Sequence, residues 1–170
     1  MTTRKFPVTF KTPKSSLPGN AIITKTVLTQ YDKSHVQFKK DVDGKISGEV
    51  YMDPDILGAT PNISAVNLII FLFASDTSGN VTRMNAEYKS IADEGETLDP
   101  ATLSLGTAQD VTMPVTQNER KKVTIPLTAA DFDSGDRVMV QAFHEGTHAN
   151  DTLASNTLCE VDGLLEVVFT

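Results

Sequence analysis

Tryptophan is absent from this chain of 170 residues, and cysteine occurs only once. A single cysteine, Cys159, cannot form an internal disulfide, which excludes the small secreted domains that depend on several disulfides. Its apolar setting after Leu158 favours a buried, inert thiol over a nucleophile. The longest apolar run, residues 66–74, is too short to span a membrane. The first residues also lack the basic and then apolar pattern of a secretory leader, so we expect assembly in a cytoplasm.

Charge is distributed unevenly along the chain. The net charge is −7, yet the first 30 residues contain no acid and the bases Arg4, Lys5, Lys11, Lys14 and Lys25. An acidic body disfavours nucleic-acid binding, so we predict neither a nucleic acid nor a membrane as a partner. A basic end on an acidic body predicts that this end lies on an acidic surface, either its own or a neighbour's.

Apolar residues recur mainly at every second position, which is the period of a strand. The expected strands number about eight to ten, are separated by turn signals such as Asp43-Gly44, and leave almost no room for helix. They cover residues 21–29, 36–38, 46–52, 63–74, 81–91, 103–115, 121–127, 137–143 and 158–169. This pattern predicts an all-β chain that forms a single antiparallel two-sheet β-sandwich, with a jelly-roll-like topology as the first choice.

The N-terminal segment is predicted to be extended. We divide the chain into a basic arm, residues 1–20, and a sandwich domain, residues 21–170. Pro7 and Pro13 cannot donate to a ladder, which keeps this segment out of a central strand. Residues 1–17 then either dock on a neighbouring protein or fold back as an edge strand of their own sandwich. For docking, the predicted contact residues are Arg4, Lys5, Phe6, Val8, Phe10, Lys11 and Lys14.

Residues 144–148 read His-Glu-Gly-Thr-His, the H-E-x-x-H pattern of zinc proteases. That chemistry needs a helix, because one helical turn brings both histidines to one metal. Here the alternating segment 137–143 leads into the motif, and Gly146 and the polar residues after it favour a turn. The remaining candidates for a third ligand, Glu160 and Glu166, lie within an apolar segment. We therefore predict a hairpin loop, and with it no catalytic residue, no metal, no cofactor and no enzyme activity.

Aspartates gather near several predicted strand ends, where their oxygens would suit calcium. Aspartate is also favoured in turns because its side chain bonds the local backbone, and we favour this second interpretation. A structural calcium near Asp131, Asp133 and Asp136 is left open, and Asp151 is a fourth candidate ligand. Residues 41–44 look like part of an EF-hand loop, but no glutamate stands at the closing position, which favours a turn.

The last third of the chain resembles the closing hairpin of β-sandwich virion proteins of tailed bacteriophages. In those proteins a Gly-Asp pair starts a strand, a charged Gly-Thr loop ends it, and an Asn-Asp-Thr run opens the return to a final strand. The matching segments here are residues 135–136, 145–147 and 150–152, followed by the strand 164–169. This chain departs from the group in having His144 where an arginine is usual, and in lacking an aromatic-rich middle.

The resemblance implies a non-enzymatic structural protein that decorates or stabilises a phage particle through protein–protein contacts. Capsid or other virion proteins would be its partners, the virion its location, and a homo-oligomer its assembly, with a trimer expected. The alternative is a receptor- or carbohydrate-binding module of a phage tail or fibre, in which exposed loops bind the ligand. Position in the head or the tail is left open.

Overall fold

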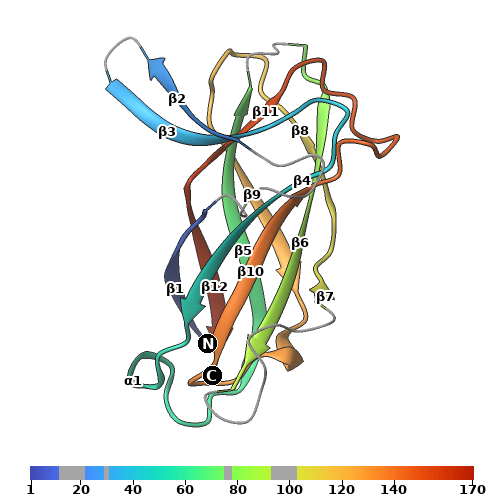
Figure 1. Ribbon diagram of the computed structural model, residues 1–170. Coiled ribbons are helices and arrows are strands. Elements are labelled where there is room, and N and C mark those ends of the chain that lie inside the picture. The colour runs from blue at the N-terminus through green and yellow to red at the C-terminus, as the bar shows by residue number, and fades with distance from the viewer. Residues whose placement is uncertain (12–21, 29–30, 75–77, 93–102) are drawn as a thin grey trace.

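The computed structural model describes residues 1–11, 22–28, 31–74, 78–92 and 103–170 (Figure 1). Strands dominate these ranges, as expected, and the helical elements are short. The elements in chain order are β1 (Thr2–Thr9), β2 (Ile22–Leu28), β3 (Tyr31–Phe38), β4 (Gly44–Tyr51), α1 (Pro54–Leu57), β5 (Ile63–Ala74), β6 (Val81–Ile91), β7 (Ser104–Leu105), β8 (Gln109–Thr112), β9 (Lys121–Leu127), η1 (Ala129–Asp131), β10 (Arg137–His144), β11 (Thr157–Glu160) and β12 (Asp162–Phe169). In these ranges no helix is long and apolar enough to cross a membrane.

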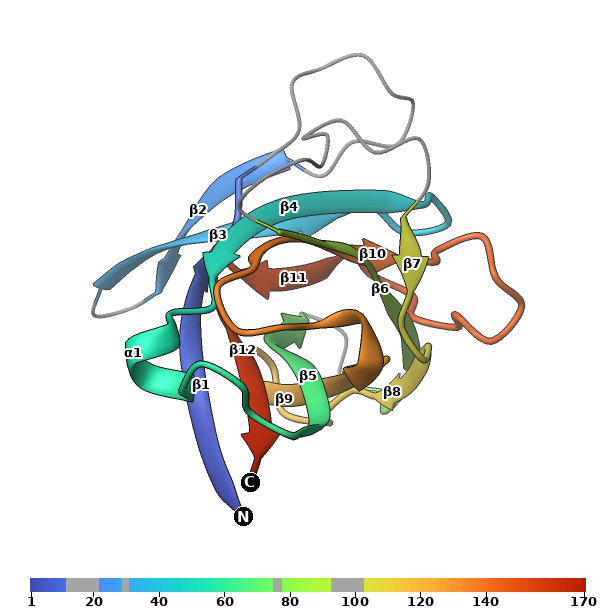
Figure 2. The same ribbon diagram turned by 90° about the horizontal axis from the view of Figure 1, so that it is seen from below.

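Two antiparallel sheets face each other (Figures 1 and 2), which confirms the predicted β-sandwich. In the seven-stranded sheet, β5 is central and pairs with β9 along one edge. Along its other edge β5 pairs with β12 and then with β11. On the far side of these two strands β1 pairs with β12 and β3 pairs with β11, and β2 pairs with β3 at the end of the sheet. In the five-stranded sheet the order is β4-β10-β6, and β7 and β8 both pair with β6.

The core lies between the sheets and follows the alternation of each strand. The inward side chains of β5 are Val66, Leu68, Ile70, Leu72 and Ala74. The buried side chains of the other strands include Val138 and Val140 of β10 and Leu165 and Val167 of β12, and Phe73 of β5 is buried as well. Phe71 and Phe73, however, have the parity of the outer face. The Arg120 guanidinium stacks 3.5 Å from the Phe71 ring centroid, and His35 contacts Phe73 edge-on.

The N-terminal segment is an edge strand of its own sandwich, which is the second of the two places considered for it. β1 pairs with β12 along its whole length, from Thr2 opposite Phe169 to Thr9 opposite Asp162. The side chains that were predicted to dock on a neighbour are instead part of this chain's core, and they are Phe6, Val8 and Phe10. The docking prediction is therefore wrong for these three residues, because the sandwich itself buries the apolar side of the strand.

The charged residues of the segment follow the same arrangement. Lys5 lies 3.4 Å from Glu166 on β12, so the acidic surface that it meets is its own. Arg4 is exposed. An edge strand also tolerates Pro7, because such a strand needs ladder partners on one side only. Lys14 and the predicted boundary after residue 20 lie outside the described residues.

A bulge within residues 160–163, where β11 passes into β12, lets β1 complete the core. Between Leu72 and Ile69 of β5 the facing chain advances from Cys159 to Leu164, so it accommodates two extra residues. A side chain at Gly163 would meet the Phe10 ring at 2.7 Å. The Phe10 amide donates to the Val161 carbonyl at 2.7 Å, which holds the end of β1 against the bulge.

The end of β1 also reaches the other sheet. Lys11 and Ser47 of β4 exchange two backbone hydrogen bonds, of 2.7 and 3.0 Å. These bonds close one side of the sandwich at the level of Lys11. Nearer the start of β1 no such bridge joins it to β4 in the described residues, so the outer sides of the two strands form the walls of a groove.

Candidate functional site

The H-E-x-x-H residues lie at the end of a strand and in the turn that follows, which confirms the predicted turn. The loop is not the predicted hairpin, because β10 belongs to the five-stranded sheet and the next strand, β11, to the seven-stranded sheet. His144 is the last residue of β10, and its side chain is buried. Its Nε2 lies 3.0 Å from the Asp151 carboxylate and its Nδ1 lies 3.1 Å from the Val42 carbonyl oxygen. Both partner atoms are oxygens of this chain that accept hydrogen bonds. Neither nitrogen is then left to bind a metal.

Asp151 is the anchor of this loop. It accepts hydrogen bonds from the backbone amide of Arg83 at 2.8 Å and from the Thr82 hydroxyl at 3.2 Å, as well as from His144. Burial of the Asp151 carboxyl opposes its ionisation. The hydrogen bonds and the charge of His144 outweigh that effect and hold the pKa of Asp151 below its ordinary value.

The other residues of the motif hold the loop in place as well. The Glu145 carboxylate accepts hydrogen bonds from Arg83 and Asn85 of β6. Thr147 bonds the Asp43 carboxylate through both its amide and its hydroxyl. His148 is exposed and accepts the amide of Asn150 at 3.1 Å, away from the buried His144. The side chains of the motif therefore fix the conformation of the loop through hydrogen bonds. The absence of catalytic zinc remains a prediction.

The aspartates at the strand ends accept hydrogen bonds from within the chain. Asp131 accepts from the Tyr88 hydroxyl at 2.7 Å, and Asp136 accepts from Ser90 and from the amide of Asp133. Among the described residues, no group of three or more acidic, histidine or cysteine side chains is placed to hold a metal ion. The bond from the Asp133 amide to Asp136 is the local backbone contact that the turn interpretation expects, whereas the bonds from Tyr88 and Ser90 join the two aspartates to β6.

The single cysteine is buried, as its apolar neighbours in the sequence predict. Cys159 is fully buried, and burial raises the pKa of its thiol well above the ordinary range. A thiol that is held protonated and away from solvent is a poor nucleophile. Cys159 is therefore part of the core and contributes no reactive group.

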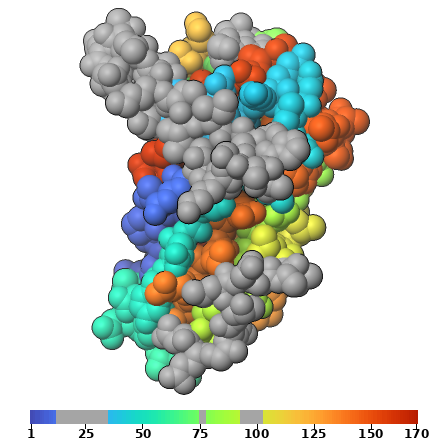
Figure 3. All heavy atoms as spheres, viewed as in Figure 1, coloured from blue at the N-terminus to red at the C-terminus, as the bar shows by residue number. Residues whose placement is uncertain are grey.

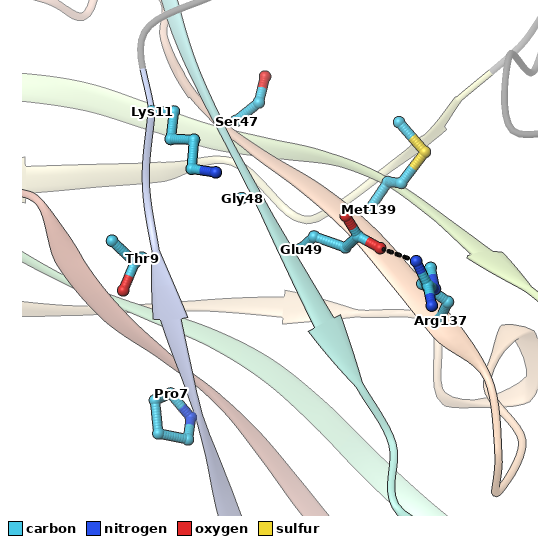
Figure 4. A pocket seen from close by; sticks show the side chains of 8 residues that line it. All are labelled: Pro7, Thr9, Lys11, Ser47, Gly48, Glu49, Arg137 and Met139. Carbon is cyan, nitrogen blue, oxygen red and sulfur yellow. Dashed lines mark ion pairs between the residues drawn. The ribbon is translucent and has the colours of Figure 1, made fainter.

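The groove between β1 and β4 has a volume of about 550 Å³. Figure 3 shows the face on which β1, β4 and β10 reach the surface side by side, in blue, teal and orange. Figure 4 shows its lining from close by. The lining residues are Pro7, Thr9, Lys11, Ser47, Gly48, Glu49, Arg137 and Met139.

Strand alternation explains why these residues face the groove. On β1 the even-numbered residues Phe6, Val8 and Phe10 enter the core, so the odd-numbered residues 7, 9 and 11 face outward. The same alternation places Ser47 and Glu49 on the outer side of β4. In the register of the sheet Glu49 is opposite Met139, and Tyr51 is opposite Arg137. One strand thus supplies both core and groove.

A charged pair is the most polar feature of the groove. Arg137 Nη1 lies 2.9 Å from Glu49 Oε1, and both side chains are about half exposed (Figure 4). Gln141 donates to the Ser47 hydroxyl at 3.1 Å, which continues the polar surface along the sheet. Tyr51, which is opposite Arg137 in the register and on the same face of β4 as Glu49, is 47% exposed. Charge, hydroxyl groups and an aromatic ring therefore share one rigid sheet face.

Gly48 lets the two walls approach each other. A Cβ atom there would stand 2.5 Å from Val8 Cγ1 and 3.3 Å from Phe10 Cδ1. We expect Gly48→Ala to lower the free energy of unfolding by roughly 1–3 kcal/mol, because β1 must move or Val8 must change its rotamer. Urea unfolding measures this loss. Ser104→Ala, at an exposed strand position, is the control and should change little. Equal stability of both variants would show that β1 does not pack over Gly48.

Sequence reasoning found one cation of the groove and missed the rest. Lys11 was assigned to a partner-binding arm, and it lines the groove instead. Glu49, Arg137 and Met139 were not singled out. Their alternation with buried neighbours was readable, but the pairing of three segments that are distant in the sequence was not.

No protein-family model matches the chain, and the search of curated proteins found no match. Solved structures with a similar backbone include the tailspike protein 4 enzymatically active domain of bacteriophage CBA120 (6% identity, TM-score 0.43). That likeness covers 98% of this chain and 19% of the tailspike chain, so this chain spans about a fifth of its length.

Two carbohydrate-binding modules are similar to the chain in the same way. TmCBM61, solved in complex with β-1,4-galactotriose, is 9% identical with a TM-score of 0.41, over 95% of this chain and 86% of its own. The family 11 module of Clostridium thermocellum, solved with a mixed-linked β-1,3-1,4 tetrasaccharide, is 10% identical with a TM-score of 0.38, over 95% of both chains. No residue of the groove is carried over from these structures.

Proposed function

We propose that this chain is a non-enzymatic binding module that holds a saccharide in the groove between β1, β4 and β10. In the phage setting that the sequence resemblance implies, it would be a receptor- or carbohydrate-binding part of a tail or fibre. The observation that carries the proposal is the Arg137–Glu49 pair at the groove surface, beside hydroxyl groups and apolar atoms. The proposed site lies on a sheet face, whereas the sequence had suggested loops.

The chemistry of the groove suits a sugar. A saccharide presents hydroxyl groups that both donate and accept, and C–H faces that are apolar. Arg137 supplies donors in a fixed fork and Glu49 supplies acceptors, while Thr9 and Ser47 supply hydroxyls. The side chains of Met139 and Pro7, with the Tyr51 ring nearby, offer surfaces for the C–H faces. A volume of about 550 Å³ falls in the range of small-molecule sites, which is roughly 300–1,000 Å³.

Binding without hydrolysis follows from the acids that are present. Glycoside hydrolysis ordinarily uses two carboxyl groups on either side of the scissile bond. Glu49 is the sole carboxylate among the described residues that line the groove, and it is paired with Arg137. This composition supports a binding role.

Decoration of a capsid has less support than groove binding. A docking arm at the N-terminus would have supported that interpretation, but its apolar side chains Phe6, Val8 and Phe10 are buried in the chain's own core. A virion location, capsid partners and a trimer remain predictions.

The proposal is tested with an array of immobilised oligosaccharides and polysaccharides. We expect the purified chain to bind a subset of them, and Arg137→Ala to weaken that binding about tenfold or more, since it removes charge-assisted hydrogen bonds. Glu49→Ala should weaken the binding of a neutral saccharide, because it removes a hydrogen-bond acceptor. Lys122→Ala changes one exposed charge on β9 of the other sheet and should bind as the parent does. Binding to no carbohydrate, or binding that neither groove variant changes, would refute the proposal.

A further inference from the structure

We infer that the groove selects saccharides that carry a carboxylate, such as those with uronic acid units. This inference rests on the proposed function and adds the ligand's charge to it. The eight lining residues include two cations, Lys11 and Arg137, and one acid, Glu49. The local balance is therefore positive on a chain whose net charge is −7. A basic groove on an acidic protein attracts an anion to this site and away from the remaining surface.

Lys11 provides a charge that the described part of the chain does not neutralise. Its backbone is fixed by the two hydrogen bonds with Ser47, while its side chain is exposed and makes no ion pair among the described residues. Lys45, on the same face of β4 as Ser47, is different, because its ammonium lies 2.6 Å from the Glu87 carboxylate. Lys11 is therefore positioned by the backbone and available to a ligand.

Arg137 provides the geometry for a carboxylate. In its contact with Glu49 one nitrogen, Nη1, is used, so most of the guanidinium's five N–H donors remain. A planar guanidinium fork matches a carboxylate in a two-point interaction. Figure 4 shows Lys11 and Arg137 on opposite sides of β4, so a ligand that lies across the strand would meet one cation at each side.

Glu49 should affect the binding of a neutral saccharide and of an acidic one in opposite directions. With no ligand bound it orients Arg137, and the exposed pair stabilises the fold only slightly. A carboxylate ligand would compete with Glu49 for Arg137 and would be repelled by it. A neutral sugar would instead use Glu49 as a hydrogen-bond acceptor. Glu49→Gln should therefore strengthen the binding of an acidic saccharide and weaken the binding of a neutral one.

The test uses matched pairs on the array: uronic acid oligosaccharides of several linkages, and the same oligosaccharides after reduction of their carboxyl groups. We expect the acidic member of at least one pair to bind about tenfold or more tightly than its reduced counterpart. Titration calorimetry with that acidic probe then compares the variants. Arg137→Gln should weaken binding about tenfold, Lys11→Gln about three- to tenfold, and Glu49→Gln should strengthen it. Lys122→Gln is the matched control and should bind as the parent does.

The outcomes separate the two proposals. Equal binding of both members of every pair, or binding of reduced members only, would overturn the acidic preference and leave saccharide binding intact. Weaker binding of the acidic probe by Glu49→Gln would also overturn it. Binding to no saccharide would refute the proposed function and this inference with it. Polyglutamate spotted on the same array addresses a peptide ligand, and if it binds as tightly as the acidic saccharides, the ligand class is wrong.

Discussion

A chain that lacks residues 1–11 is expected to unfold where the full chain is folded. Phe6, Val8 and Phe10 are 6%, 0% and 2% exposed, and β1 covers the edge of β12. Burial of each such side chain contributes roughly 1.5–3 kcal/mol. The sum is comparable with the whole stability of a typical domain, about 5–15 kcal/mol. Circular dichroism during heating measures the loss.

A smaller deletion and a point variant make this test specific. Removal of residues 1–3, which are exposed, should leave melting nearly unchanged. Phe10→Ala should lower the free energy of unfolding by roughly 3–5 kcal/mol, because it leaves a cavity beside Gly163. A stable, normally melting chain without residues 1–11 would instead mean that β1 is a detachable arm, and the docking interpretation would regain its support.

The second large effect is expected at Asp151. Asp151→Ala removes the acceptor of three donors, namely the His144 ring, the Thr82 hydroxyl and the Arg83 amide, in a largely buried setting. Leaving a buried donor without its acceptor typically costs about 1–3 kcal/mol for each group, so the loss of one acceptor for three donors should be large. Urea unfolding at neutral pH measures the difference from the parent. Asp162→Ala, on the exposed edge of β12, should cost far less.

The same contact predicts an acid dependence. The pKa of Asp151 is lower in the folded chain than its ordinary value of 3.8, so its ionised form stabilises the fold above that value. As the pH falls from about 4 through the lower folded pKa, this contribution is lost. The stability difference between the parent and Asp151→Asn should therefore narrow below about pH 4. A difference that stays constant from pH 7 to pH 2 would show that Asp151 does not titrate in this contact.

Strand periodicity predicted the sandwich because each buried face leaves a two-residue repeat in the sequence. The segment 137–143 is the clearest case, since its alternation also excluded the helix that H-E-x-x-H would need as a zinc site. The two-residue repeat did not predict the strand boundaries where a strand is interrupted. The expected strand 103–115 is two short strands, β7 and β8, both on the edge of β6. The expected strand 158–169 is interrupted at Val161, which separates β11 from β12.

Pairing could not be predicted from the sequence, and the groove depends on pairing. β1 and β12 lie at opposite ends of the chain, yet they are neighbours in one sheet. The groove then needs β4 and β10 in register, so that Glu49 and Arg137 meet. Phe71 shows that alternation along a strand does not always identify the buried face. In a run as apolar as residues 66–74, both faces of the strand look buried, and hydrophobicity does not tell the inner face from the outer one.

The most direct measurement of the central claim is a map of the residues that a bound saccharide perturbs. The isotope-labelled chain would be titrated, with amide resonances recorded, using the oligosaccharide that binds best on the array. We predict that the shifts centre on residues 7–11, 47–51 and 137–139, and that Arg137→Ala removes them. Shifts confined to the loop 145–152, or no shifts at saturating oligosaccharide, would contradict a binding groove between β1, β4 and β10.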